Sequence, residues 1–103
     1  MQPTVAQLIH AMNTIAPEHL AEDWDQVGLH LGDPDWPIQG HALLTIDLTE
    51  AVAEEAIATG AGAIVAYHPP FFRPLPRLTS ADPKGRIGLR LAGAGIAVYS
   101  PHT

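Results

Sequence analysis

The stretch that decides the fold is AIVAYHPPFFRP, residues 63–74. It opens as a short apolar run of the kind that forms a buried strand. The run ends at His68, because Pro69 and Pro70 lack the backbone N–H that a central strand needs. We therefore predict a buried strand that stops at His68 and gives way to a stiff loop. Ligands of open α/β sheets bind at the carboxyl ends of the strands, so His68 marks a candidate site.

The residues before this stretch complete a βαβ unit. Residues 43–47 form an apolar strand, and residues 48–59 have the pattern of a helix. Asp47 and Glu50 match a capping box at the start of that helix, with Thr49 as a competing cap, and the cap is our preferred interpretation of Asp47. A strand, a helix and a strand in so short a segment are typical of two parallel strands joined by a crossover helix.

The rest of the chain adds elements to both sides of this unit. Hydrophobic spacing predicts two further helices, over residues 3–16 and 84–92, and two further strands, over residues 27–31 and 96–99. Residues 69–83 form a proline-rich connection. The fold class that follows is α/β, with a mixed, largely parallel sheet and flanking helices.

The composition limits what the protein can be. Its 103 residues suffice for one small domain, and 47% hydrophobic with 16% charged residues is typical of a folded chain. The formal net charge of −6 argues against general nucleic-acid binding. The chain has no cysteine, which excludes disulfide scaffolds and thiolate metal sites. No membrane-length apolar run or signal sequence is present, and the first arginine is Arg73, so we expect a cytoplasmic protein without membrane contact.

Side chains able to bind a metal follow the predicted parallel strands. Asp47, His68 and His102 each lie near the end of one strand, and parallel strands share a carboxyl edge. Imidazole and carboxylate are suitable ligands for zinc, iron or manganese when no thiolate is available. The alternative is that Asp47 caps its helix and that both histidines lie in ordinary turns. For His68 and His102, spacing alone leaves both interpretations open.

Four stretches, in the same order, resemble motifs of the Nif-three-like family, whose members are often labelled GTP cyclohydrolase 1 type 2. They are PEHLAEDWDQVGL, TIDLT, YHPP and YSPHT, at residues 17–29, 45–49, 67–70 and 99–103. The Tyr-His-Pro-Pro form, together with Arg73 and Arg77, is similar to the eukaryotic-type branch. The resemblance covers nearly the whole chain.

The resemblance implies a two-domain α/β protein with a centre of two divalent metal ions, assembled as a homo-oligomer and often as a hexamer. Matched residue by residue, it assigns His68 and His102 as metal ligands. Tyr67 stands where the family has the first histidine of a pair, and a phenol rarely ionises at neutral pH, so we expect Tyr67 to hydrogen-bond near the metal. The family's remaining ligands have no counterpart, so residues 1–103 are expected to be the N-terminal part of one incomplete domain. Alone, it would bind metal weakly and expose an apolar surface.

Other side chains have a functional and a structural interpretation. Trp24 and Asp25 could approach a purine, but we prefer a packed tryptophan with Asp25 capping a turn. Arg73 and Arg77 flank the proline-rich loop, where they either meet a phosphate or are simply solvated.

The leading hypothesis is a metal-dependent hydrolase that acts on a nucleotide or another small molecule. Hydrolysis of the GTP ring is the activity that the family label implies, and no catalytic residue is assigned within the chain. The alternative is a non-catalytic regulatory or scaffold protein that carries metal, which the tyrosine at position 67 favours. A plain mononucleotide-binding domain ranks last, because no glycine-rich loop follows a strand.

Overall fold

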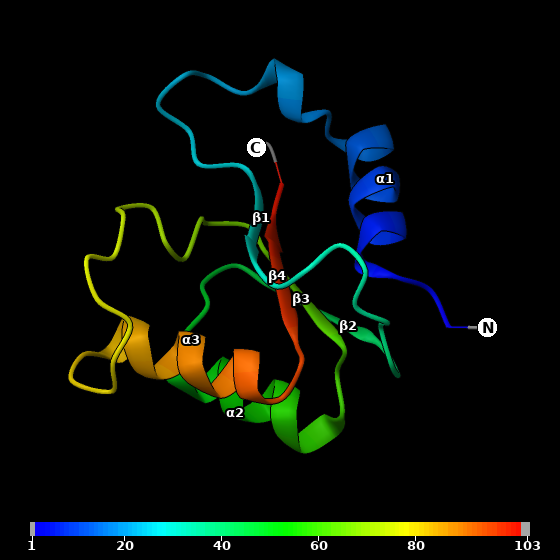
Figure 1. Ribbon diagram of the computed structural model, residues 1–103. Helices are drawn as coiled ribbons and strands as arrows, with labels where there is room; N and C mark the ends of the chain where they lie inside the picture. The colour runs from blue at the N-terminus through cyan, green and yellow to red at the C-terminus, as the bar shows by residue number, and fades with distance from the viewer. Residues whose placement is uncertain (1, 102–103) are drawn as a thin grey trace.

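Four short strands form one sheet in the order β1-β4-β3-β2 (Figure 1). The computed structural model describes residues 2–101. In chain order, its elements are α1 (Val5–Ile15), a 3₁₀ turn (Glu18–Leu20), β1 (Gly28–Leu31), β2 (Ala42–Thr45), α2 (Glu50–Thr59), β3 (Ala63–Ala66), α3 (Pro83–Gly93) and β4 (Ala97–Ser100). Strands β2, β3 and β4 are mutually parallel, and β1 pairs antiparallel with β4. The predicted α/β class with a mixed, largely parallel sheet is confirmed.

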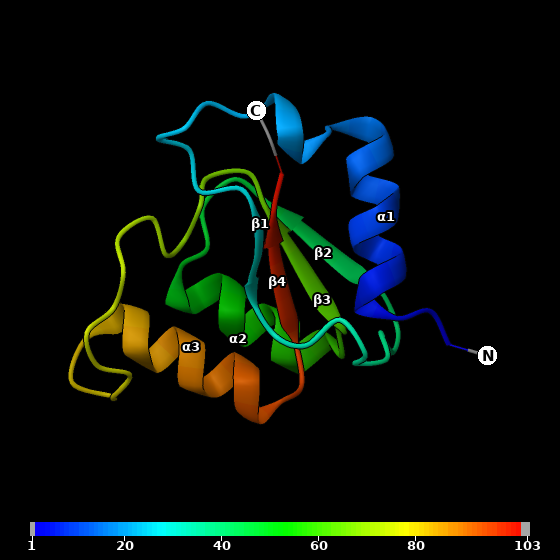
Figure 2. The same ribbon diagram turned by 45° about the horizontal axis from the view of Figure 1, so that its top comes forward.

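The helices lie in two layers around this sheet (Figure 2). Helices α2 and α3 pack side by side on one face, over a core that includes Ile64, Val98 and Leu91, all fully buried. Helix α1 lies on the other face, where Val5 packs with Ala63 and Ala97 of the central strands. Strand β3 therefore has both faces covered, which explains why it reads as a continuous apolar run.

Each helix begins at a residue suited to cap it. The hydroxyl of Thr4 accepts a hydrogen bond from the backbone N–H of Gln7, and the side-chain oxygen of Gln7 accepts one from the backbone N–H of Thr4. Asp82 accepts from the N–H of Gly85 at the start of α3, with Pro83 in the first helical position. Within the described part of the chain, no helix is long and apolar enough to cross a membrane.

The face that carries α1 is only partly covered. Leu44 and Ile46, on and just after β2, are 75% and 63% exposed. Leu43, which precedes Leu44 in β2, packs against the core on the opposite face. Ile15 at the end of α1 is also exposed. The prediction that the chain exposes apolar side chains is confirmed for this side of β2.

Candidate functional site

The parallel pairing of β2 and β3 brings two predicted site residues together. Thr45 and Ala66 are partners at the ends of the two strands. The backbone pairing continues beyond them, because the N–H of Tyr67 donates to the carbonyl of Thr45 and the N–H of His68 donates to the carbonyl of Ile46, both at 2.9 Å. The chain segments that carry Asp47 and His68 therefore leave the sheet side by side at its carboxyl edge.

Asp47 and His68 are joined by a hydrogen bond. The imidazole Nδ1 of His68 lies 2.7 Å from Oδ1 of Asp47, and the two side chains are 57% and 67% exposed. An ionised carboxylate only accepts hydrogen bonds, so Nδ1 of the imidazole carries the proton. In a neutral imidazole, Nε2 then keeps its lone pair free for a metal or for a proton.

The preferred interpretation of Asp47 as a helix cap is wrong. Helix α2 is capped by Thr49, whose hydroxyl accepts a hydrogen bond from the N–H of Val52 at 3.2 Å. The helix begins at Glu50, so Asp47 lies too far upstream to reach its first free N–H groups. The carboxylate of Asp47 is thereby available to His68.

Tyr67 is exposed next to this pair. Its ring centroid lies 5.2 Å from that of His68, with the two planes tilted by 54°. About half of its surface is open to solvent. Within the described residues, its hydroxyl forms no hydrogen bond, so Tyr67 borders the pair without binding to it.

The antiparallel strand brings a further segment to the same edge. Gly28, the first residue of β1, pairs with Ser100, the last residue of β4. The chain entering β1 therefore approaches from the carboxyl side, and this approach carries Trp24 and Asp25. Trp24 is 66% exposed, so the prediction that it packs under the sheet is wrong. It lies in the loop between the 3₁₀ turn and β1.

The other predicted site residues are not part of the Asp47–His68 pair. His102, the second predicted ligand, lies outside the described residues. Arg73 and Arg77 are both exposed in the loop after β3, and neither forms an ion pair within the described part of the chain. The structure thus unites Asp47 with His68 and leaves Arg73 in the adjoining loop.

One polar contact near this edge has no signal in the sequence. The hydroxyl of Tyr99 in β4 donates a 2.7 Å hydrogen bond to the carboxylate of Glu18, which also accepts one from the amide of Asn13. Burial, together with this bond to Glu18, raises the pKa of Tyr99 above its ordinary value. The contact joins the loop after α1 to the sheet across 81 positions of sequence, a separation that no spacing rule covers.

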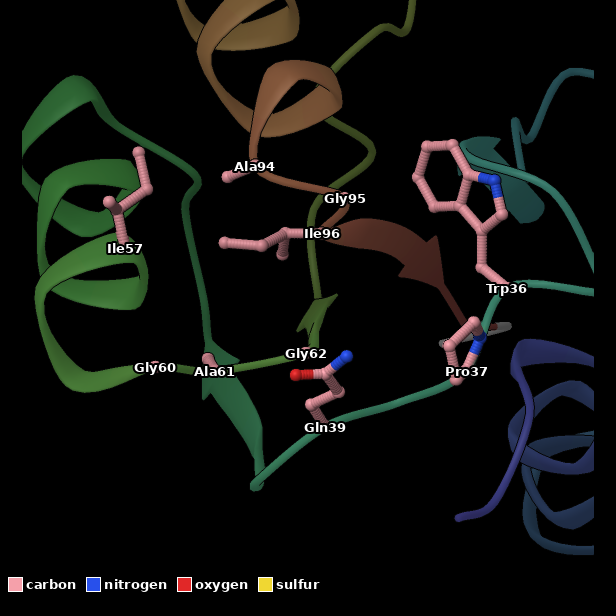
Figure 3. Close-up of a pocket in the computed structure, with 10 residues that line it drawn as sticks. All are labelled: Trp36, Pro37, Gln39, Ile57, Gly60, Ala61, Gly62, Ala94, Gly95 and Ile96. Carbon is pink, nitrogen blue, oxygen red and sulfur yellow. The ribbon is translucent and has the colours of Figure 1, made fainter.

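A hollow of about 370 Å³ lies at the opposite, amino edge of the sheet (Figure 3). It is lined by glycines, apolar side chains and one amide: Trp36, Pro37, Gln39, Ile57, Gly60, Ala61, Gly62, Ala94, Gly95 and Ile96. None of these residues can transfer a proton at neutral pH or offer an imidazole or carboxylate to a metal. The hollow is therefore unsuited to hydrolytic chemistry, and the candidate site is the exposed pair at the carboxyl edge.

The pair by itself is an incomplete metal site. Among residues 2–101, no group of three or more histidine, aspartate or glutamate side chains is arranged to hold a metal ion. A catalytic zinc typically has three protein ligands. What the described residues offer is one imidazole held by a carboxylate, which is the usual arrangement of a metal-binding histidine and the partner that orients it.

Comparison with known proteins identifies the family. A model of the Duf34/NIF3 (NGG1p interacting factor 3) family matches residues 3–103. The chain belongs to this family. It is 48% identical over 100 residues to a protein NIF3 homolog of Schizosaccharomyces pombe, covering 95% of this chain and 36% of that protein. It is 45% identical over 87 residues to a GTP cyclohydrolase 1 type 2 homolog of Lactococcus lactis, covering 84% and 34%.

A solved structure agrees with this assignment. The crystal structure of a Bacillus cereus protein related to NIF3 superimposes with a TM-score of 0.90 at 34% identity, and covers 99% of this chain but 28% of that one. The chain therefore spans about a third of the length of the family members that it matches.

Proposed function

We propose that this NIF3-family chain contributes His68 to the metal centre of a hydrolase. The observation that carries the proposal is the 2.7 Å hydrogen bond between Nδ1 of His68 and Asp47 at the carboxyl edge of parallel strands. That bond fixes the ring and directs Nε2 away from the carboxylate, so Nε2 would be the ligand atom. Asp47 would orient the imidazole, and His102 would be a second ligand.

The metal would be zinc, iron or manganese, because imidazole and carboxylate are the donors on offer and the chain has no cysteine. When bound, a divalent ion supplies the Lewis-acid chemistry that hydrolysis needs. In the whole protein we propose two such ions, and assembly into a homo-oligomer of up to six copies. The name of the Lactococcus lactis relative supports a nucleotide as substrate.

The chain's own residues would have separate tasks at this edge. The exposure of Asp47 and His68 leaves room for a substrate to reach the pair from solvent. Pro69, directly after His68, stiffens the backbone and restricts where the imidazole can point. Asp25, Tyr67 and Arg73 approach the same edge and would contact the substrate.

The test is a zinc titration of the whole protein, of which this chain is a part, followed by calorimetry with three variants. We expect His68→Ala to abolish tight binding and Asp47→Ala to weaken it by about 10- to 100-fold, the usual effect of removing a carboxylate that orients a metal ligand. His41→Ala is the matched control, because His41 is an exposed histidine that directly precedes β2 at the amino edge. Unchanged zinc affinity in His68→Ala would contradict the proposal.

A second candidate function has one observation in its favour. Tyr67 stands beside His68 with its hydroxyl unbonded among the described residues, in a position where a further imidazole would have strengthened a metal site. This favours a non-catalytic scaffold or regulatory protein. Nucleotide turnover with added metal, compared between the wild type and His68→Ala, separates the two functions, because a scaffold would show no metal-dependent turnover.

A further inference from the structure

A second hollow lies beside the proline-rich loop that follows β3. Its volume is about 330 Å³, within the range of small-molecule pockets. Apolar side chains form most of the wall, among them Pro69, Pro70 and Phe72, and the cations Arg73 and Lys84 complete it. Apolar surface next to concentrated positive charge is the combination that suits a ligand with an apolar body and an anionic group.

The two cations of the hollow are not neutralised by carboxylates among the described residues, although the chain is acidic overall. The sequence has 5 lysines and arginines against 11 aspartates and glutamates. Arg86 and Arg90 follow the expected pattern and pair with glutamates of α2 at 2.8 Å and 3.0 Å. Arg73 and Lys84, by contrast, form no ion pair and no side-chain hydrogen bond within the described residues.

The position of Lys84 adds to this imbalance. Lys84 is the second residue of α3, where the helix ends in free N–H groups with a partial positive charge. A lysine there is not stabilised by the helix, since cations are favoured at the opposite end. The nearby carboxylate of Asp82 accepts from the N–H of Gly85 at 2.9 Å, so one of its oxygens already serves the backbone.

We propose that this hollow binds a small organic phosphate, with the phosphate between Arg73 and Lys84 and the apolar part against Phe72 and Pro70. A guanidinium donates two parallel hydrogen bonds to phosphate, and an ammonium adds a point charge. Carboxylates would also be attracted, but a phosphate brings more charge and three acceptor oxygens to the two cations. Neither Asp47 nor His68 lines the hollow, so the proposal does not depend on a bound metal. Arg73 is shared with the substrate contact proposed above, whereas Lys84 belongs to the hollow alone.

The test uses phenyl phosphate as the probe, titrated into the protein in low salt with EDTA present and followed by calorimetry. We expect saturable binding that Arg73→Gln and Lys84→Gln each weaken by about tenfold or more, the usual effect of losing a charged hydrogen bond. Inorganic phosphate should bind more weakly than phenyl phosphate, because it leaves the apolar wall uncovered. EDTA removes metal, so this result stands or falls separately from the zinc titration.

Arg77→Gln is the matched control. Arg77 is an exposed arginine of the same loop but does not line the hollow, and its loss changes the net charge by the same amount. We expect phenyl phosphate affinity to stay within twofold of the wild type. An equal loss in Arg77→Gln would mean diffuse attraction and would overturn the proposal.

Two other results would also overturn it, namely no saturable binding by the wild type and equal affinity for phosphate and phenyl phosphate. Far-ultraviolet circular dichroism checks that each variant is folded. Arg73→Lys keeps the positive charge without the planar fork, and we expect it to bind more weakly than the wild type but more tightly than Arg73→Gln.

Discussion

The two edges of the sheet differ in the residues that they carry: closely packed backbone at one edge and titratable side chains at the other. At the amino edge, backbone segments approach closely around Gly62 and border a large hollow without titratable side chains. At the carboxyl edge, Asp47 and His68 are exposed, polar and joined to one another. The hollow at the amino edge is therefore not the site of the proposed chemistry. Substitutions at the amino edge should cost stability, whereas those at the carboxyl edge should cost binding.

Gly62→Ala tests the first half of this comparison and should have the largest effect on stability. A Cβ at this position would lie 2.5 Å from both the backbone N and O of Gln39, where only a movement of the main chain can relieve the overlap. Overpacking of this kind costs up to about 3 kcal/mol in the free energy of unfolding. Urea denaturation followed by circular dichroism measures the loss.

Gly93→Ala is the control for the same substitution. Gly93 ends α3, and an added Cβ there would meet no atom within 4 Å. Alanine is the better helix former by about 0.8–1 kcal/mol in a helix interior, so we expect this variant to be as stable as the wild type or slightly more so. If Gly62→Ala were equally harmless, the amino edge would not have the close backbone packing described above.

Tyr99→Phe tests whether any polar contact near the carboxyl edge supports the fold. The change removes the hydrogen bond to Glu18 while keeping the aromatic ring in the core. We expect the free energy of unfolding, measured by urea denaturation, to fall by about 1.5 kcal/mol. This value is at the lower end of the range for hydrogen bonds to charged groups, because Glu18 retains Asn13 as a partner.

The same tyrosine predicts a pH dependence. Burial and Glu18 raise the pKa of Tyr99 in the folded state, so the unfolded chain releases its phenol proton first as the pH rises. The stabilisation that Tyr99 gives the folded state is fully present below pH about 10, the ordinary pKa of a tyrosine, and is lost as the pH rises above it. Urea midpoints at pH 8 and pH 11 should differ less in Tyr99→Phe than in the wild type. Tyr67→Phe is the control, and an equal change there would contradict the assignment to Tyr99.

How much the sequence could predict depended on how local each signal was. The prolines after His68 end the strand whatever the rest of the chain does, so the strand and the edge where His68 lies were predictable. The partner of Asp47 was not, because two capping patterns competed for α2 and only the structure shows that Thr49 prevailed. With Thr49 in that position, Asp47 lies beyond the reach of the helix and beside His68.

Contacts between distant segments were beyond prediction for a different reason. Glu18 and Tyr99 meet because β1 runs antiparallel to β4 and so returns the loop after α1 to the end of the sheet. Alternation of apolar residues identifies a strand but gives neither its neighbour nor its direction. The same lack of information explains the error at Trp24, since the pattern could not show that this side chain would be exposed.

Glu50→Gln tests a contact between α2 and α3, apart from the Asp47–His68 pair, and should have the smallest effect. Glu50 in α2 pairs with Arg86 in α3 at 2.8 Å, and this hydrogen bond lowers the pKa of the Glu50 carboxyl. Its stabilising contribution is therefore present above the ordinary glutamate pKa and is lost as the pH falls through the lowered value. Both groups are exposed to solvent, which screens the pair and makes its contribution small. We expect a slightly lower melting temperature at pH 7 that returns to the wild-type value near pH 2. A loss as large as that of Gly62→Ala would mean that the layer of α2 and α3, and not the amino edge, is the most sensitive part of this fold.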